Sequence, residues 1–326
     1  MATTPIIQTN GLTKLYKDGK STVKAIDNLT MSVPDGSIFG FLGPNGSGKS
    51  TTIRMLVGLA HPTQGDAEVA GSNIKNDPNG VRAHVGYLAQ SPLYYNYMTG
   101  RETLEYVAGF YPWVTDPLPS RVNQLLGMVG LDGAGDRKVG GYSGGMKQRL
   151  GIAQALVGRP KVVILDEPVS ALDPIGRHEV LEIMRNLRGQ TTIMFSTHIL
   201  DDVQRVADYV AVLDHGKLIT QAATGELLGR YTQNDIDVVV QAEQAVTPHL
   251  EAQLSSLPSV AAVTVKEVGN SPSGQPFINL VVLAKPGAID QARREIQRTV
   301  TGMDLLLQRC EPLRLDLESV FLKLVN

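Results

Sequence analysis

Residues 43–51 read "GPNGSGKST", and this stretch decides the fold. It follows a short apolar run, residues 38–42, that is typical of a strand, and it precedes apolar residues at helical spacing between positions 53 and 60. The segment is therefore a turn from a strand into a helix. Its three glycines let backbone N–H groups converge with no side chain in the way, and the helix adds its positive N-terminal end. Such a turn predicts an anion site, for which phosphate is the natural occupant.

The pattern G-x-x-x-x-G-K-[ST] is matched in full from Gly43 to Ser50, in the strand–loop–helix context that this motif requires. We expect Lys49 to reach the β- and γ-phosphates of a nucleotide and the Ser50 hydroxyl to ligate Mg²⁺. The predicted phosphate-binding residues are Gly43, Pro44, Asn45, Gly46, Ser47, Gly48, Lys49, Ser50 and Thr51.

The composition is that of an ordinary globular protein. The chain has 326 residues, 42% of them hydrophobic, and a formal net charge of −2, which is enough length for about two domains and gives no basic excess that would indicate a nucleic-acid partner. No run approaches the ~18 apolar residues needed to cross a bilayer, and the first residues do not resemble a signal peptide. The single cysteine, Cys310, excludes an intramolecular disulfide. We expect a soluble chain in a reducing cytosol.

The first two thirds of the chain alternate strand and helix patterns. "KVVILDEP" at 161–168 and "TTIMFSTH" at 191–198 are short apolar runs suited to strands buried on both faces, and a helical pattern at 180–187 connects them. This is a βαβ unit and predicts a parallel sheet. Residues from about 92 to 158 are helical by pattern and predict a helical subdomain inserted into an α/β core. The first predicted domain spans 1–230.

A different pattern begins after residue 230. Strands at 235–242, 262–268, 277–284 and 305–315 and helices at 247–258 and 287–300 give the order β-α-β-β-α-β, which is a ferredoxin-like α+β domain over 231–326. A last helix is expected to carry Leu317, Val320, Phe321 and Leu324 on one face. Because no polar or basic cluster points to a ligand, a dimerisation or packing module is favoured over a regulatory domain.

Acidic residues end one of the buried strands. We expect Asp166 to hold Mg²⁺ through its water shell and Glu167 to act as the general base for an attacking water. An acidic pair after a strand is often only a solvated strand end, but downstream of a phosphate loop it indicates phosphoryl transfer to water. His198 ends the next strand at the same edge of the sheet, so contact with the γ-phosphate and the attacking water is expected.

A second helix start is predicted within "YSGGMKQRLGIAQALVG" at 142–158. Ser143, Gly144 and Gly145 lead this helix with bare N–H groups and a hydroxyl, which again suits a phosphate. One chain thus has two phosphate-binding helix ends, and the two ends need not serve the same nucleotide.

The motifs "GPNGSGKST", "YSGGMKQRL", "VVILDEP", "SALDP" and "FSTHIL" together resemble those of the ATP-binding subunit of ABC transporters, and the resemblance covers residues of about 5–230. It implies an ABC-type P-loop NTPase core. It also implies a second ATP-binding subunit placed head to tail, so that Ser143, Gly144 and Gly145 bind the γ-phosphate of the ATP that Lys49 of the other subunit holds. Asp173, in "SALDP", would cross the same interface, and ATP would close the pair until hydrolysis reopens it.

The resemblance assigns two more residues. Gln90 matches the glutamine that meets Mg²⁺ and the water and whose loop couples the site to a membrane partner, and Tyr16 matches the aromatic residue that stacks on adenine. The tyrosines at 94, 95 and 97 are candidates to line a groove for a helix of that partner. The second motif departs from the common pattern at Tyr142 and Met146, which leaves its serine and glycines unchanged.

The function implied by the resemblance is an ATPase that uses ATP and Mg²⁺ to power transport through separate integral membrane subunits. The form "YSGGMKQRL", with "DLESVFLKL" at 316–324, resembles the branch whose members mostly export drugs, lipids, polysaccharides or ions, so export is the expected direction. Such a subunit would be peripheral, on the cytoplasmic side of the cell membrane, and most simply a homodimer. Two alternatives exist. A soluble ABC ATPase acting on ribosomes or nucleic acid usually has two ATPase units or a long coiled coil, and neither occurs in this sequence. An importer subunit often carries an OB-like barrel, unlike the predicted C-terminal domain.

Overall fold

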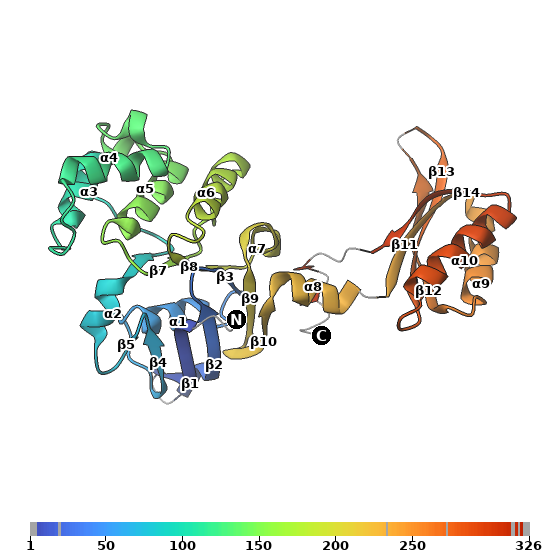
Figure 1. Ribbon diagram of the computed structural model, residues 1–326, viewed down its shortest axis with the longest axis horizontal. Coiled ribbons are helices and arrows are strands. Elements are labelled where there is room, and N and C mark those ends of the chain that lie inside the picture. Colours follow the sequence, from blue (N-terminus) through green and yellow to red (C-terminus); the bar gives the residue numbers. More distant parts are fainter. Residues whose placement is uncertain are drawn as a thin grey trace. The chain divides into compact units, whose positions relative to one another are not determined.

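The computed structural model describes residues 5–18, 21–232, 234–271, 273–313, 317–318 and 320–321. The chain forms two compact units (Figure 1), and the second begins at Gly225. The sequence placed this boundary after residue 230, but helix α8 (Thr224–Thr232) starts at the observed boundary and belongs almost wholly to the second unit. Among the described residues, no helix combines the length and the hydropathy needed to span a membrane.

The central sheet of the first unit has six strands in the order β10-β9-β3-β8-β7-β6. All but β10 run parallel to their neighbours, as the βαβ pattern predicts. Strands β3, β7 and β8 are buried along their whole length. Because parallel strands end at one edge, the segments that follow them meet there. The strands are β3 (Ile38–Leu42), β6 (Val85–Leu88), β7 (Val162–Asp166), β8 (Thr192–Thr197), β9 (Tyr209–Asp214) and β10 (Lys217–Ala223).

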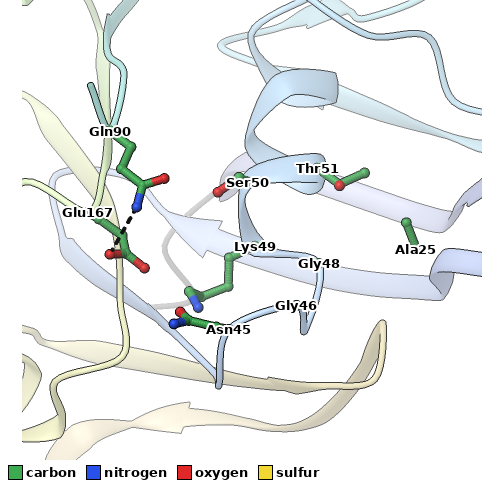
Figure 2. A pocket seen from close by; sticks show the side chains of 9 residues that line it. All are labelled: Ala25, Asn45, Gly46, Gly48, Lys49, Ser50, Thr51, Gln90 and Glu167. Carbon is green, nitrogen blue, oxygen red and sulfur yellow. Dashed lines mark hydrogen bonds between the residues drawn. The ribbon is translucent and has the colours of Figure 1, made fainter. Parts of the chain in front are cut away.

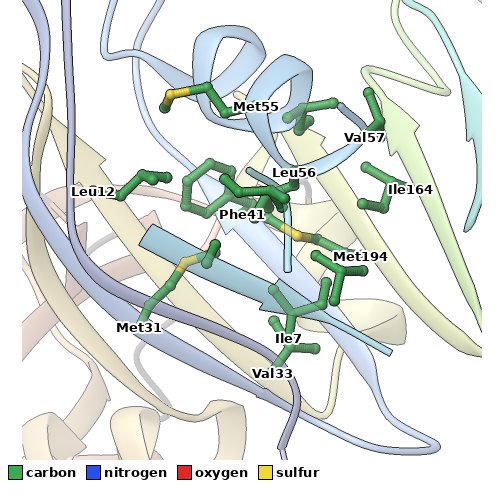
Figure 3. Close-up of a cluster of buried hydrophobic side chains, with 14 of the residues drawn as sticks. Ile7, Leu12, Met31, Val33, Phe41, Met55, Leu56, Val57, Ile164 and Met194 are labelled. Carbon is green, nitrogen blue, oxygen red and sulfur yellow. The ribbon is translucent and has the colours of Figure 1, made fainter. Parts of the chain in front are cut away.

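A second, antiparallel sheet of the first unit was not predicted. Its order is β2-β1-β4-β5, with β1 (Pro5–Asp18), β2 (Ser21–Pro34), β4 (Gln64–Val69) and β5 (Ser72–Asn73). Buried side chains from this sheet, from the central sheet and from helix α1 (Lys49–Leu56) form one apolar core (Figure 3). In that core, Phe41 and Ile164 come from the central sheet and Met55 comes from α1. Ile7 and Val33 come from the antiparallel sheet. The phosphate loop therefore starts and ends in well-packed elements.

Helices occupy the segment between β6 and β7, where the sequence predicts an inserted helical subdomain. They are α3 (Gly100–Ala108), α4 (Leu118–Met128) and α5 (Gly144–Leu156), with short 3₁₀ turns at Asp132–Ala134 and Val139–Gly141. Helix α5 packs against α3, α4 and β6, so it joins the subdomain to the sheet (Figure 1). The remaining helices of the first unit are α2 (Pro78–His84), α6 (Pro174–Asn186) and α7 (Leu200–Val206).

The second unit has the predicted β-α-β-β-α-β order. Its antiparallel sheet runs β12-β13-β11-β14, and buried residues such as Leu250 of α9 and Ile296 of α10 pack on it. Within the predicted last helix Leu317 and Val320 are buried and Phe321 is half-buried, whereas Leu324 lies outside the described residues. The elements are β11 (Asp235–Gln241), η3 (Gln244–Val246), α9 (Thr247–Ser255), β12 (Val260–Asn270), β13 (Pro276–Ala284), α10 (Ile289–Gly302) and β14 (Leu306–Pro312).

Candidate functional site

The turn between β3 and α1 has a backbone that only glycine fits. Gly48, the residue before α1, has φ of 103°. A Cβ atom on Gly48 would lie 2.6 Å from the carbonyl oxygen of Ala25 and would also meet the side chain of Ile26. Gly46 has φ of 82°, which again lies in the left-handed region that favours glycine. No side chain of these glycines therefore covers the start of α1, where the first backbone N–H groups have no partner within the helix and can bind an anion.

Lys49 lies across this loop. Its Nζ donates hydrogen bonds to the carbonyl oxygens of Gly43, at 2.7 Å, and Pro44, at 3.1 Å. Burial lowers the pKa of Lys49, and the charges of Glu167 and Asp166 oppose that shift. A bound anion would supply the opposite charge that this partly desolvated ammonium group lacks within the loop.

A pocket of about 350 Å³ opens beside the loop (Figure 2). It collects residues from β2, from the loop and α1, and from the segments that follow β6 and β7. The sequence predicted every lining residue except Ala25, because an alanine in an unpredicted strand carries no chemical signal. The lining residues are Ala25, Asn45, Gly46, Gly48, Lys49, Ser50, Thr51, Gln90 and Glu167.

Asp166 is fixed at the base of the site by two hydroxyl groups. Its Oδ1 accepts hydrogen bonds from Ser50 Oγ, at 3.2 Å, and from Ser196 Oγ, at 2.6 Å. Ser196 is fully buried, and its Oγ also accepts a hydrogen bond from the backbone N–H of Glu167, at 2.9 Å. Sequence reasoning missed Ser196, although its place in β8, directly opposite Asp166 of β7, follows from pairing the two strands.

Glu167 stands between Gln90 and His198. Its Oε2 lies 3.4 Å from Gln90 Nε2, and its Oε1 lies 3.4 Å from His198 Nδ1. Glu167 is 7% exposed and has φ of 49°, an uncommon backbone conformation that turns its side chain into the pocket. Both contacts are long for hydrogen bonds, so the carboxylate keeps the capacity to accept a proton from a further group.

The second predicted phosphate-binding end lies elsewhere on the first unit. Ser143 caps α5, its Oγ accepting a hydrogen bond from Met146 N at 3.2 Å, and Asp173 caps α6 in the same way through Gly176 N at 2.7 Å. The two helix starts adjoin, since a Cβ atom on Gly145 would lie 3.8 Å from the Cα atom of Gly176. Ser143, Gly144 and Asp173 are exposed, and the pocket lining includes none of them.

Tyr16 also lies outside the pocket lining. It is on β1, opposite Val23 of β2, and its side chain is 41% exposed with Lys14 Nζ 5.1 Å from the ring centroid. Ala25, two positions along β2 from Val23, does line the pocket. The adenine-stacking role of Tyr16 stays a prediction.

Comparison with known proteins identifies the family. The model of the ABC transporter family matches residues 26–170. The ABC transporter ATP-binding protein YxlF of Bacillus subtilis is 36% identical over 303 residues, which cover 93% of this chain and 95% of YxlF. The daunorubicin/doxorubicin resistance ATP-binding protein DrrA of Streptomyces peucetius is 36% identical over 268 residues, covering 78% and 80% of the two chains.

A solved structure agrees with these relatives. CbiO1 of Clostridium perfringens, described as part of the ABC transporter complex CbiONQ, superposes with a TM-score of 0.63 at 28% identity, over 70% of this chain and 92% of CbiO1. The match to YxlF extends through both compact units. With its glycine loop, buried lysine and paired acids, this chain belongs to the ATP-binding subunits of ABC transporters and is an ATPase of that family.

Proposed function

We propose that this chain powers export through separate membrane-spanning subunits, and that it works as a head-to-tail pair with a second ATP-binding subunit, most simply a copy of itself. The observation that carries the proposal is the separation of its two phosphate-binding ends. Lys49, Ser50 and Glu167 share one pocket, whereas Ser143 and Gly144 are exposed and outside its lining. A second chain that presents Ser143 over the pocket would complete the site, and ATP would then hold the two chains together.

The pocket residues suit phosphoryl transfer from ATP to water. The ammonium group of Lys49 offsets the charge of the β- and γ-phosphates, and the N–H groups at the start of α1 bind their oxygens. Glu167 accepts a proton from the attacking water, while Gln90 and His198 contact one carboxylate oxygen each and hold it in place. Asp173 and Ser143 would close the site from the second chain.

The donor set also fits Mg²⁺. Ser50 and Gln90 line the pocket, and Asp166 Oδ1 lies 3.2 Å from Ser50 Oγ. The hydroxyl, the amide carbonyl and the carboxylate supply oxygen ligands, as Mg²⁺ prefers. Mg²⁺ usually binds few protein groups and completes its shell with water and phosphate. When bound, it would neutralise phosphate charge. Ser196 holds Asp166 for this role.

An exposed groove lined by aromatic side chains could bind a helix of the membrane subunit. Tyr95, Tyr97, Met98, Glu102 and Tyr106 line a space of about 590 Å³, and Tyr95 and Tyr106 stack edge to face with centroids 6.2 Å apart. We assign this groove to a helix of the membrane partner, which would place the chain on the cytoplasmic face of the cell membrane.

Tyr94 does not belong to that groove. Its hydroxyl donates a hydrogen bond to Lys147 O at 2.9 Å, and burial raises its pKa, so its side chain points into the helical subdomain. Leu93, beside it, is 96% exposed and adds an apolar side chain to the same loop. The name of DrrA, a resistance protein, supports export, since resistance follows directly from moving a compound out of the cell.

Glu167→Gln tests the proposal. The substitution removes the base but keeps the shape of the side chain, so turnover should fall by about 10²-fold or more while ATP still binds. Because ATP then persists, size-exclusion chromatography with light scattering should show a dimer that forms only with ATP. The matched control is Lys49→Ala in the Glu167→Gln chain, which should stay monomeric.

The same variant tests the membrane partner. Purified from its own cells in detergent with ATP and Mg²⁺, Glu167→Gln should carry an integral membrane protein that mass spectrometry identifies. Wild-type turnover by Glu167→Gln would refute the base assignment, and recovery of ribosomal or DNA-bound proteins in place of a membrane protein would refute the transport role.

A further inference from the structure

Helices α6 and α7 are joined by arginine side chains at both ends of α7. Arg185 of α6 donates a hydrogen bond to the carbonyl oxygen of Arg205, at 3.0 Å, and Arg188, just after the end of α6, donates one to that of Val206, at 2.7 Å. Both acceptors lie at the C-terminal end of α7. Arg177, near the start of α6, reaches the N-terminal end of α7. The two helices also pack against each other.

The contact of Arg177 at the N-terminal end is the unusual one. Its Nε lies 2.5 Å from Asp202 Oδ1, and Asp202 is fully buried. The other oxygen of Asp202, Oδ2, makes no hydrogen bond to any described residue. Burial raises the pKa of Asp202, the Arg177 guanidinium opposes that shift, and the neighbouring charges are Asp201 and Arg205.

A buried carboxylate with one unpaired oxygen costs stability, and an apolar residue of similar volume often serves a core at least as well. The pair is therefore better explained by what it connects than by what it adds to stability. Arg177 lies four residues after Asp173, which caps α6, and Asp202 lies four residues after His198, which contacts Glu167. The ion pair thus links the first turn of α6 to the first turn of α7. These turns follow the segment that ends at Asp173 (the Asp173 loop) and the segment that contains His198 (the His198 loop).

We propose that the Arg177–Asp202 pair is a positioning device that makes the Asp173 loop and the His198 loop move as one body. This inference rests on the proposed head-to-tail function. When a second chain contacts Asp173, the displacement of α6 passes through Arg177 to the start of α7 and shortens the 3.4 Å separation between His198 Nδ1 and Glu167 Oε1. Hydrolysis then depends on contact with the second chain, because that contact tightens the hold of His198 on the base.

Asp202→Leu is the first test. Leucine has a similar volume and removes the buried carboxylate, and the Arg177 side chain, which is 30% exposed, keeps Asp201 as an ion-pair partner, so the protein should stay folded. The Kd for ATP should stay within about twofold, because the pocket residues lie on other elements, while kcat should fall about 10- to 100-fold from misplacement of His198. A purely structural pair would give no such separation of kcat from ATP affinity and stability.

Two further variants sharpen the test. Arg177→Met with Asp202→Asn breaks the link without leaving a buried charge, and it should show the same loss of kcat. Arg185→Gln is the matched control on the same helix: it cuts a contact to the far end of α7 and should leave kcat within about twofold. Folded Asp202→Leu and Arg177→Met/Asp202→Asn proteins with kcat within about twofold of wild type would overturn the proposal.

The outcome is separable from failure of the head-to-tail model. Asp202→Leu in the Glu167→Gln chain keeps Ser143 and Asp173, so the dimer should still form with ATP. If Glu167→Gln alone forms no ATP-dependent dimer, the proposed function fails. If that dimer forms and Asp202→Leu leaves kcat at the wild-type value, only the positioning role fails.

Discussion

At the scale of single residues, Ser196 shows how much of the site depends on a side chain that never reaches the pocket. Its Oγ donates to Asp166 Oδ1 and accepts from Glu167 N–H, so Ser196→Ala leaves a buried N–H without that partner and leaves the Asp166 carboxylate with only the longer hydrogen bond from Ser50. We predict a loss of about 1–3 kcal/mol in the free energy of unfolding and a higher Mg²⁺ concentration for half-maximal ATPase rate. Denaturant unfolding and a Mg²⁺ titration measure the two effects. Ser170→Ala is the control, because Ser170 is half-buried and its Oγ donates to the carbonyl oxygen of Glu167. Unchanged stability and Mg²⁺ dependence would contradict the assigned role.

At the scale of elements, the strand-to-helix turn was predictable because its function demands glycine. Gly48→Ala adds a Cβ that meets Ala25 O and the Ile26 side chain at positive φ, so nucleotide affinity should drop and unfolding free energy should fall by more than the ~1–3 kcal/mol of backbone strain alone. Gly189 also has a positive φ but open space around it, so Gly189→Ala should lower the free energy of unfolding only by the backbone strain and should bind ATP normally. Thermal unfolding and binding of a fluorescent ATP analogue test this difference; equal losses in both variants would show that the clash is unimportant. The sheet that supplies Ala25 was not predictable, since β1 pairs with β4 across more than forty intervening residues and local patterns carry no such register.

At the scale of the whole molecule, the sequence predicted two units, the parallel strands of the first and the element order of the second, because buried parallel strands and the β-α-β-β-α-β alternation leave strong local patterns. It placed the boundary late, since α8 has ordinary helical spacing and nothing in its residues says which unit it joins. In the candidate site, too, only residues within a local motif could be predicted. Pocket residues such as Lys49 and Glu167 were predicted from motifs, whereas Ser196 and Asp202 belong to no predicted site and became visible only through their buried contacts. In the proposed head-to-tail pair, the exposed Ser143 end meets the nucleotide of a second chain, so the pair of chains is what the decisive experiment must test.

The most direct measurement mixes two inactive variants. Lys49→Ala lacks one half of each composite site and Ser143→Arg lacks the other, so each protein alone should hydrolyse almost no ATP. In a one-to-one mixture half of the randomly formed pairs are mixed, and each mixed pair keeps one intact site, so about a quarter of the wild-type ATPase rate should return if one site can turn over by itself. Recovery of activity in the mixture would establish that two chains share each site. A fully active Ser143→Arg protein, or a mixture as inactive as its components although mixed pairs form, would contradict the head-to-tail account.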